Sequence, residues 1–418
     1  MIVMNKYVII GNGTAAVGCI EGIRSVDKDS GITVVSAENH HVYCRPLISY
    51  YLENKTTVEK MKYRPDDFYS VNNCKVIYGK KAEKIDKENK KVVIDGGETL
   101  DYTAVCIATG SSPFVPPFKG LESVEKKFSF MTLDDALSLE EAITPESRVL
   151  IIGAGLIGLK CAEGIAERVK SITVCDLAER VLSSILDDEC AALMQKKLEA
   201  HGIGSMLGDS AESFDKNTAV MKSGKKVEFD ILVLAVGVRA NTSLAKDAGA
   251  EVNRGIVTDL HMKTAADGIY AAGDCSESYD ISCGMNRVLA ILPNAYMQGF
   301  CAGQNMAGKE SVFDKSIPMN SIGFFGLHAM TAGSYFTEKD GGEMYEEKSD
   351  GKIKRLYTKD GVLTGFIIIG DTARVGIYTS LIREKTPIDS IDFEMIKKYP
   401  SLLPFGADYR RQKLGGVV

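Results

Sequence analysis

Two glycine-rich segments about 140 residues apart have residue types and spacings that suit phosphate binding. The first follows an apolar run and reads Gly11-Asn-Gly13-Thr-Ala-Ala16. Gly11 would allow a tight turn, Gly13 would let the backbone approach a diphosphate, and Ala16 would keep the next helix close to the strand. Glu38 comes 22 residues after Ala16, where an acid can bind ribose hydroxyls. Alone, this pattern also fits a packing turn followed by a solvated acid.

The second segment repeats the pattern with three glycines: Gly153, Gly155 and Gly158. Asp176 follows 18 residues beyond Gly158, at the end of the next apolar run. A carboxylate there would accept hydrogen bonds from a ribose diol and repel the 2′-phosphate of NADPH, so it favours NADH. Arg180 lies close enough in sequence to compensate for that charge. Two such cradles predict two dinucleotides, one that delivers electrons and one that stores them.

Short β-branched runs alternate with helix-like stretches through most of the chain, which predicts parallel sheets with helical crossovers. The runs are Tyr7–Ile10, Ile32–Val35, Ala104–Ala108, Arg148–Ile152, Ser171–Cys175 and Ile231–Val236. The start of the chain, residues 1–10, reads as a first strand and not as a leader peptide. A proline-rich stretch after Gly110 indicates a domain boundary, and glycine turns after residue 340 indicate antiparallel hairpins. The predicted fold is α/β, with two Rossmann-like domains and a small C-terminal α+β domain.

Composition excludes several classes of function. The chain has 418 residues, 50 basic against 56 acidic side chains and a net charge of −6, which argues against nucleic acid as a partner. Its longest apolar stretch, Val149–Leu159, is too short for a membrane span of roughly 20 residues. The ten cysteines form no CxxC pair and the five histidines show no ligand spacing, so we predict no metal site. Scattered single thiols favour a cytoplasmic protein.

Three further motifs accompany the cradles: Ala108-Thr109-Gly110, the segment 235–241 that contains Gly237, and the segment 268–274 that ends in Gly273-Asp274. With them, residues 5–310 resemble the pyridine nucleotide–disulfide oxidoreductase superfamily. The similarity is strongest to its NADH:rubredoxin reductases, NADH oxidases and the NADH-binding part of nitrite reductases. The resemblance implies FAD in the first cradle and NADH in the second. It also implies an FAD domain of residues 1–113 and 244–312, an NAD domain of 114–243 and an interface domain of 313–418.

The resemblance further implies roles for individual residues. The Asp274 carboxylate would hold the flavin ribityl chain, and the segment with Arg45-Pro46 would reach the FAD phosphates and adenosine. The helix after Pro293 would point its positive N-terminus at the flavin pyrimidine edge. The predicted FAD set is Gly11, Gly13, Ala16, Glu38, Arg45, Pro46, Ala108, Thr109, Gly110, Gly273, Asp274 and Pro293. The predicted NAD set is Gly153, Gly155, Ile157, Gly158, Asp176 and Gly237.

Two positions depart from that pattern. Cys44 lies near the place of the redox cysteine of the oxidases and CoA-disulfide reductases, but one residue away, where the rubredoxin-reductase pattern has serine. It is either a candidate catalytic thiol or a small packing residue. Lys160 stands where many relatives have a glutamate that contacts the nicotinamide, so it is either a second catalytic candidate or a helix-surface lysine.

The resulting hypothesis is an FAD-dependent NADH:acceptor oxidoreductase. Without a CxxxxC pair, we expect electrons to pass to a protein carrier, rubredoxin-like or iron–sulfur, or to a small acceptor. One alternative is a Cys44-dependent NADH oxidase, peroxidase or CoA-disulfide reductase. Another is a flavin subunit of a larger electron-transfer complex. The C-terminal domain would contact either a second copy of the chain or such a partner.

Overall fold

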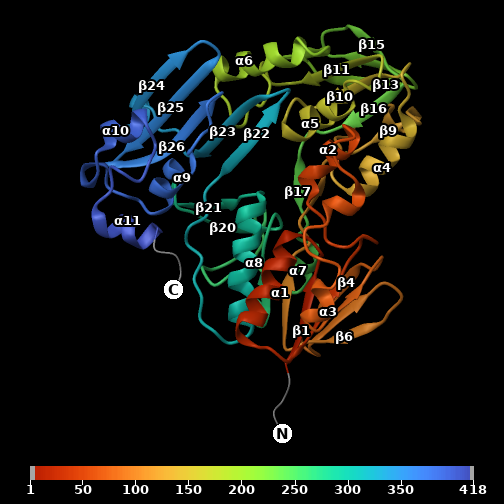
Figure 1. Ribbon diagram of the computed structural model, residues 1–418. Helices are drawn as coiled ribbons and strands as arrows, with labels where there is room; N and C mark the ends of the chain where they lie inside the picture. Colours follow the sequence, from red (N-terminus) through yellow and green to blue (C-terminus); the bar gives the residue numbers. More distant parts are fainter. Residues whose placement is uncertain (1–4, 415–418) are drawn as a thin grey trace. The chain divides into compact units, whose positions relative to one another are not determined.

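The computed structural model describes residues 5–414, so residues 1–4 of the predicted first strand lie outside the described part. The chain divides into two units. The larger runs up to Ser278 and includes Arg287–Phe313, while the smaller comprises Tyr279–Asn286 and the chain from Asp314 onward. Both glycine cradles follow strands of parallel sheets (Figure 1), so the predicted α/β class is confirmed.

One parallel sheet of the larger unit carries the first cradle, with the strand order β19-β7-β1-β2-β3. Its strands are β1 (Lys6–Ile10), β2 (Gly31–Val35), β3 (Cys74–Ile77), β7 (Ala104–Ile107) and β19 (Ile269–Ala271). Tyr7 and Ile9 face one hydrophobic cluster while Val8 and Ile10 face another, because successive side chains of a strand point to opposite faces. Burial of both faces explains why β7 and most of β1 are continuously apolar.

Helices α1 (Thr14–Val26) and α8 (Leu292–Met306) pack together against one face of this sheet, and Figure 1 shows them side by side. Their backbones approach closely because each helix contributes two glycines, Gly18 and Gly22 from α1, Gly299 and Gly303 from α8. The other face is covered by α7 (Ser243–Asp247) and by the antiparallel sheet of β4 (Ala82–Asp86), β5 (Lys91–Ile94) and β6 (Thr99–Asp101).

A second parallel sheet carries the second cradle, with the order β12-β11-β10-β16-β9. Its strands are β9 (Lys127–Phe128), β10 (Arg148–Ile152), β11 (Ser171–Asp176), β12 (Ile203–Leu207) and β16 (Ile231–Leu234). The hydrophobic cluster on one face is shared with the antiparallel sheet of β13 (Ala211–Asp215), β14 (Thr218–Met221) and β15 (Lys226–Glu228). The helices of this region are α4 (Leu133–Ala142), α5 (Leu156–Ile165) and α6 (Asp188–Glu199).

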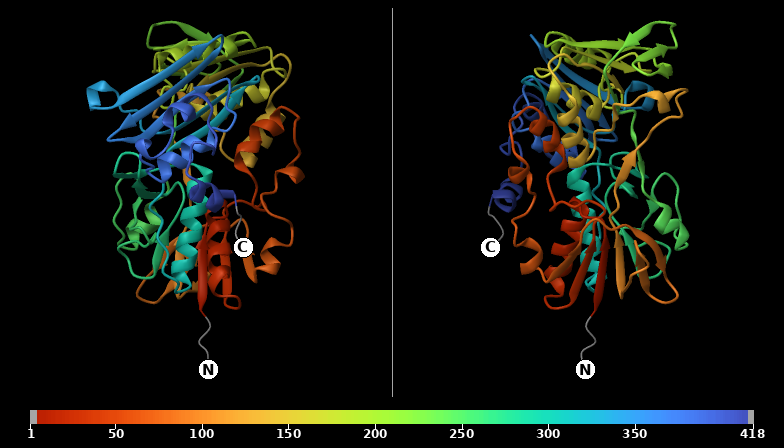
Figure 2. Two further views of the ribbon diagram at one scale, coloured as in Figure 1. Left: turned by 60° about the vertical axis from the view of Figure 1, so that its left-hand side comes forward. Right: turned by 90° about the vertical axis from the view of Figure 1, so that its right-hand side faces the viewer.

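Several short elements connect the two sheets of the larger unit. Strands β8 (Ser111–Pro113) and β17 (Val238–Ala240) pair antiparallel, so the outgoing and returning chain segments run side by side. Helix α2 (Ile48–Leu52) contacts α4 and α5, and both views of Figure 2 keep the orange α2 beside these yellow helices. The remaining elements are α3 (Phe68–Val71), β18 (Ile256–Val257), β20 (Ser276–Asp280) and β21 (Met285–Val288).

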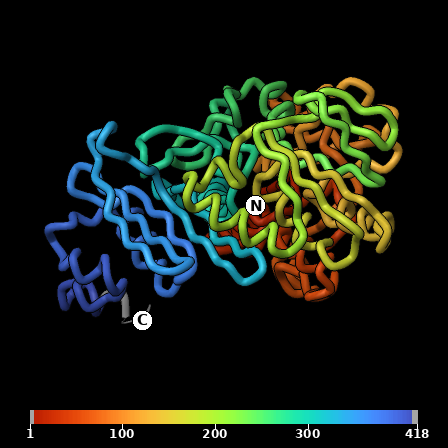
Figure 3. The backbone as a smooth tube through the Cα atoms, turned by 90° about the horizontal axis from the view of Figure 1, so that it is seen from above, coloured from red at the N-terminus to blue at the C-terminus, as the bar shows by residue number. Residues whose placement is uncertain are grey.

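The smaller unit is an antiparallel sheet with helices, as the turn pattern predicts. Its order is β22-β23-β26-β25-β24, and its blue strands run as neighbouring tubes in Figure 3. The strands are β22 (Met319–Phe324), β23 (Leu327–Gly333), β24 (Glu343–Ser349), β25 (Lys352–Lys359) and β26 (Val362–Ile369), and the helices are α9 (Gly376–Arg383), α10 (Phe393–Lys398) and α11 (Ala407–Leu414). Asp360 and Gly361 both have positive φ, which fits the tight hairpin between β25 and β26.

Candidate functional site

The first glycine loop has the geometry of a phosphate cradle. Gly11 has a φ of +112°, and a Cβ there would lie 2.1 Å from the Ala108 carbonyl oxygen, so only glycine fits. At Gly13, by contrast, an added Cβ would meet no atom within 4 Å. Ala16 is fully buried where α1 packs on the sheet. The loop therefore leaves open space at the one position where a diphosphate would approach the backbone.

Glu38, at the end of the segment after β2, is held by its neighbours. Its carboxylate accepts a hydrogen bond from Tyr43 Oη at 2.6 Å and pairs with Arg45 Nη2 at 2.7 Å. Arg45 Nη1 donates to the Met131 carbonyl oxygen at 3.0 Å, so the guanidinium also ties this segment to the start of α4. Pro46 is exposed within the 3₁₀ turn Arg45–Leu47. Glu38 and Arg45 thus form an ion pair in the segment that follows β2.

Asp274 lies in the turn after β19, beside the two chain segments that join the sheets. Ser111 Oγ of β8 donates to its carboxylate at 3.2 Å. Burial raises the pKa of Asp274, while the bond from Ser111 and the positive charge of Arg45 act in the opposite direction. Thr109 and Asn241 exchange two hydrogen bonds of 2.9 Å across the same junction. Gly110 has a φ of +63°, which allows the chain to turn there.

The second glycine loop resembles the first: its first glycine is crowded by backbone atoms and its second faces open space. A Cβ at Gly153 would lie 2.2 Å from the Ala235 carbonyl oxygen, and one at Gly158 would lie 2.0 Å from the Gly153 carbonyl oxygen. A Cβ at Gly155 would meet nothing within 4 Å. Ile157 is half-buried in the first turn of α5. Gly237 is exposed, with a φ of +120°, at the end of the segment that follows β16.

Asp176 closes the second loop. Its carboxylate accepts the Ala154 N–H at 2.6 Å and the Ala178 N–H at 2.9 Å. Arg180, the residue that could compensate for its charge, is engaged elsewhere: it pairs with Asp188 at 2.9 Å and donates to the Leu186 carbonyl oxygen at 3.1 Å. The carboxylate at the end of β11 therefore bonds to the glycine loop, while the Arg180 guanidinium bonds to Asp188 and Leu186 instead.

The two catalytic candidates lie in different elements: Cys44 precedes the 3₁₀ turn Arg45–Leu47, and Lys160 belongs to α5. The Cys44 N–H and carbonyl group pair with Met61 and Leu47, and burial raises the pKa of its thiol. A raised pKa reduces the thiolate fraction on which redox reactivity depends. Lys160 Nζ pairs with Glu163 at 2.5 Å, and its ammonium lies 5.5 Å from the centre of the Tyr50 ring of α2. Lys160 is therefore an ion-paired residue of the α2–α5 contact, with 22% of its side chain exposed.

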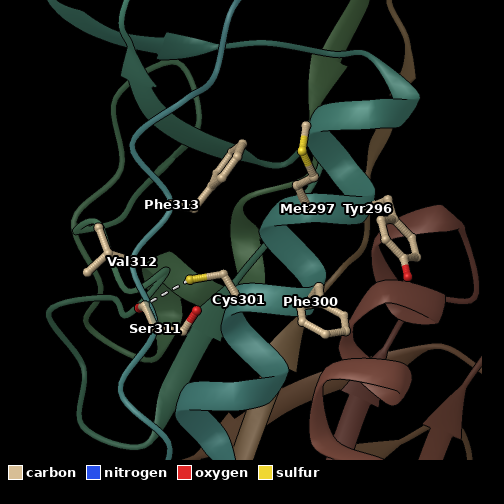
Figure 4. Close-up of a pocket in the computed structure, with 7 residues that line it drawn as sticks. All are labelled: Tyr296, Met297, Phe300, Cys301, Ser311, Val312 and Phe313. Carbon is tan, nitrogen blue, oxygen red and sulfur yellow. Dashed lines mark hydrogen bonds between the residues drawn. The ribbon is translucent and has the colours of Figure 1, made fainter. Parts of the chain in front are cut away.

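Helix α8 begins with Pro293 in its first turn, where a proline loses no helical hydrogen bond. Further along this helix lies a shallow pocket of about 360 Å³ (Figure 4). Its lining residues are Tyr296, Met297, Phe300, Cys301, Ser311, Val312 and Phe313. The Cys301 thiol donates to the Ser311 carbonyl oxygen at 3.3 Å, and burial raises its pKa. No predicted site residue lines this pocket, so it is separate from the cradles.

A protein-family model for pyridine nucleotide-disulphide oxidoreductases matches residues 5–299, which include both cradles and Asp274. The chain belongs to this family. The predicted resemblance is therefore confirmed, and the protein is an oxidoreductase of the pyridine nucleotide class.

Two relatives and one solved structure show what the chain is similar to. The chain is 31% identical to the NADH-dependent phenylglyoxylate dehydrogenase subunit epsilon of Aromatoleum evansii, over 92% of each chain. It is 26% identical to the NADH-rubredoxin oxidoreductase of Clostridium acetobutylicum, over 95% of this chain and 98% of the relative. The fold matches the crystal structure of a covalent putidaredoxin reductase–putidaredoxin complex with a TM-score of 0.84, at 23% identity, over 92% of this chain and 94% of the other.

Some residues of the site were not predicted from the sequence. Ser111, Asn241, Tyr43 and Gln298 all contact predicted site residues. Each is an ordinary polar residue in or close to one of the motifs or segments that contain the predicted site residues. Only their position in those motifs could have pointed to them.

In the part of the chain from 5 to 414, the helices are all too short or too polar to cross a bilayer.

Proposed function

We propose that this protein oxidises NADH through bound FAD and passes the electrons to a protein carrier. The observation that carries the proposal is the pair of cradles in one compact unit, each with an open middle glycine, Gly13 and Gly155. FAD bound at the first cradle would accept hydride from NADH at the second and release electrons to the acceptor. The 1–113, 114–243, 244–312 and 313–418 domain division is part of the same proposal.

The chain's own residues would bind and orient the two nucleotides. Gly11, Gly13 and the N-terminus of α1 would hold the FAD diphosphate, with Glu38 on the ribose and Arg45 close by. Asp274 would accept a hydrogen bond from the ribityl chain, and the N-terminus of α8 would stabilise negative charge on the flavin ring. Gly153, Gly155 and Gly158 would hold the NADH diphosphate. The proposal also includes the remaining predicted contacts. They are those of Pro46, Ala108, Thr109, Gly110, Gly273, Pro293, Ile157 and Gly237.

A protein carrier is the acceptor that the cysteine pattern favours. The ten cysteines are scattered singly along the chain, and the thiol nearest the expected redox position, Cys44, has a raised pKa. The relative named NADH-rubredoxin oxidoreductase supports a small redox protein as the acceptor. A cytoplasmic location fits these reduced thiols and belongs to the proposal.

Anaerobic titration with NADH tests the whole proposal. The purified protein should be yellow, should bleach with one equivalent of NADH, and should reoxidise rapidly when oxidised rubredoxin or a ferredoxin is added. Oxygen and CoA disulfide serve as comparison acceptors. Fast reoxidation by either of these would transfer the role of acceptor to a small molecule, and a protein that takes up no FAD would refute the assignment of the first cradle.

Cys44→Ser should leave carrier-dependent NADH oxidation within about twofold of the unsubstituted protein, because a thiol with a raised pKa contributes little thiolate. The measurement is steady-state turnover together with the rate of flavin bleaching by NADH. If the variant lost turnover but still bleached normally, Cys44 would be redox active, and the oxidase or disulfide-reductase alternative would hold.

Replacing Asp176 by Ser and the exposed Leu177 by Arg should reverse the nucleotide preference. The double variant loses the charge that repels a 2′-phosphate and gains one that attracts it, so the ratio of kcat/KM for NADPH and NADH should rise about a hundred-fold. Arg180→Ala is the matched control, and it should leave the ratio unchanged because Asp188 already engages this guanidinium. A loss of NADPH activity in Arg180→Ala would contradict the assignment.

A flavin subunit of a larger electron-transfer assembly is a second candidate, supported by the relative described as subunit epsilon. The smaller unit exposes large apolar side chains within a short segment, Tyr399 at 74% and Leu403 at 71%. Exposed apolar groups of this kind occur at protein–protein contacts. Isolation of the tagged chain from its native cells would show stoichiometric partners if this candidate holds, and a free chain or homodimer if it does not.

A further inference from the structure

Gln298 connects the middle of α8 to the turn that carries Asp274. Its side chain is only 1% exposed. Oε1 accepts the Gly273 N–H at 2.8 Å, and Nε2 donates to Ser278 Oγ at 2.8 Å. Ser276 Oγ lies 3.5 Å from the same Oε1. One amide therefore contacts both the turn after β19 and the strand β20.

The Gly273–Asp274 turn depends on Gln298 for a hydrogen-bond acceptor. Gly273 has a φ of +83°, and its carbonyl oxygen already accepts the N–H and the hydroxyl of Ser276, each at 2.9 Å. The Gly273 N–H is buried and bonds to Gln298. A side chain without an acceptor would leave this N–H unpaired in the interior, which costs more than an average hydrogen bond contributes.

Helix α8 is itself firmly placed against α1. A Cβ at Gly299, the residue after Gln298, would lie 2.0 Å from the Ala15 carbonyl oxygen, and one at Gly18 would lie 2.2 Å from the Tyr296 carbonyl oxygen. Because the two backbones touch, α8 cannot shift independently of the first cradle. The amide of Gln298 extends this rigid contact to the Asp274 turn.

We propose that Gln298 is a positioning residue for FAD: it locks the Gly273–Asp274 turn to α8, so that the Asp274 carboxylate and the α8 N-terminus meet the flavin in a fixed geometry. The inference rests on the proposed FAD site and adds a buried residue that bonds to the turn of Asp274. Gln298 acts through Asp274, and its effect should depend on that carboxylate.

The test measures FAD affinity of the full-length apoprotein by quenching of flavin fluorescence. Gln298→Met preserves the length of the side chain but removes both bonds, and it should raise the Kd for FAD about ten- to hundred-fold. The matched control is Gln304→Met, because Gln304 is a buried amide of the same helix that bonds to Ser25 instead. It should leave the Kd within about threefold.

A double-mutant cycle separates positioning from general loosening. In an Asp274→Ala background, Gln298→Met should change the Kd by less than about threefold, because the group through which it acts is gone. The visible flavin spectrum should shift in Gln298→Met and not in Gln304→Met. If Gln298→Met does not fold, Ser278→Ala, which removes the acceptor of Nε2 and keeps Gln298 itself, should still weaken FAD binding several-fold.

The outcomes are distinguishable. An unchanged Kd in Gln298→Met, an equal loss in Gln304→Met, or full additivity with Asp274→Ala would overturn the inference while the proposed function stands. An unsubstituted protein that binds no FAD would overturn both.

Discussion

Gly13→Asp should abolish FAD binding, and Gly155→Asp should yield a yellow protein that NADH no longer reduces. An aspartate at either position places a carboxylate where a diphosphate would approach, and the repulsion should weaken binding about a thousand-fold. Both residues are helix N-caps with ordinary φ, and neither has an atom within 4 Å of its would-be Cβ. Aspartate is a favoured N-cap, so folding should be unaffected.

The two variants control each other, because the same substitution at equivalent positions should remove different nucleotides. FAD content of the purified proteins and the NADH concentration dependence of bleaching measure the two effects. Melting temperatures of the apoproteins should agree. If Gly155→Asp lost its flavin while Gly13→Asp kept it, the two cradles would be assigned in the wrong order.

Gly299→Ala should destabilise the protein by about 3 kcal/mol, although alanine normally favours a helix over glycine by about 1 kcal/mol. The added methyl would lie 2.0 Å from the Ala15 carbonyl oxygen, and both atoms belong to helices that cannot move without opening the core. Separation of α1 from α8 would also displace the first cradle, so flavin content should fall with stability. The midpoint of urea unfolding of the apoprotein measures the first effect.

Gly376→Ala is the matched control, because there alanine should have its usual effect on helix stability. Gly376 begins α9, and a Cβ there would meet nothing within 4 Å. That variant should be neutral or slightly more stable. A stabilised Gly299→Ala protein would show that α1 and α8 do not touch through their backbones in solution.

The cradles could be found from sequence because their chemistry is local. A strand, a glycine turn and a helix start occupy about a dozen consecutive residues. Each crowded glycine is required by a backbone contact within that stretch or with the end of one neighbouring strand. The strand Arg148–Ile152 was predicted with its observed bounds for the same reason. The hairpin after Lys359 followed from the Asp360-Gly361 pair, whose positive φ values fit that turn.

Contacts between distant segments could not be found in this way. No sequence pattern shows that Glu38 pairs with Arg45 and that Arg45 reaches Met131, or that Arg180 is engaged by Asp188. Lys160 could be read as a surface lysine or a site residue, and its pairing with Glu163 beside Tyr50 depends on how α2 meets α5.

The sequence by itself determined the family, the α/β class and the two glycine loops that follow parallel strands, because these depend on short-range backbone requirements. Tertiary structure alone decided which polar groups surround the Gly273–Asp274 turn, since Ser111, Gln298 and Arg45 come from segments far apart in the chain. It also decided the close packing of α1 on α8. A glycine within a helix normally lowers stability relative to alanine. Only the tertiary structure shows that these glycines are needed, because the backbone of a second helix lies against them.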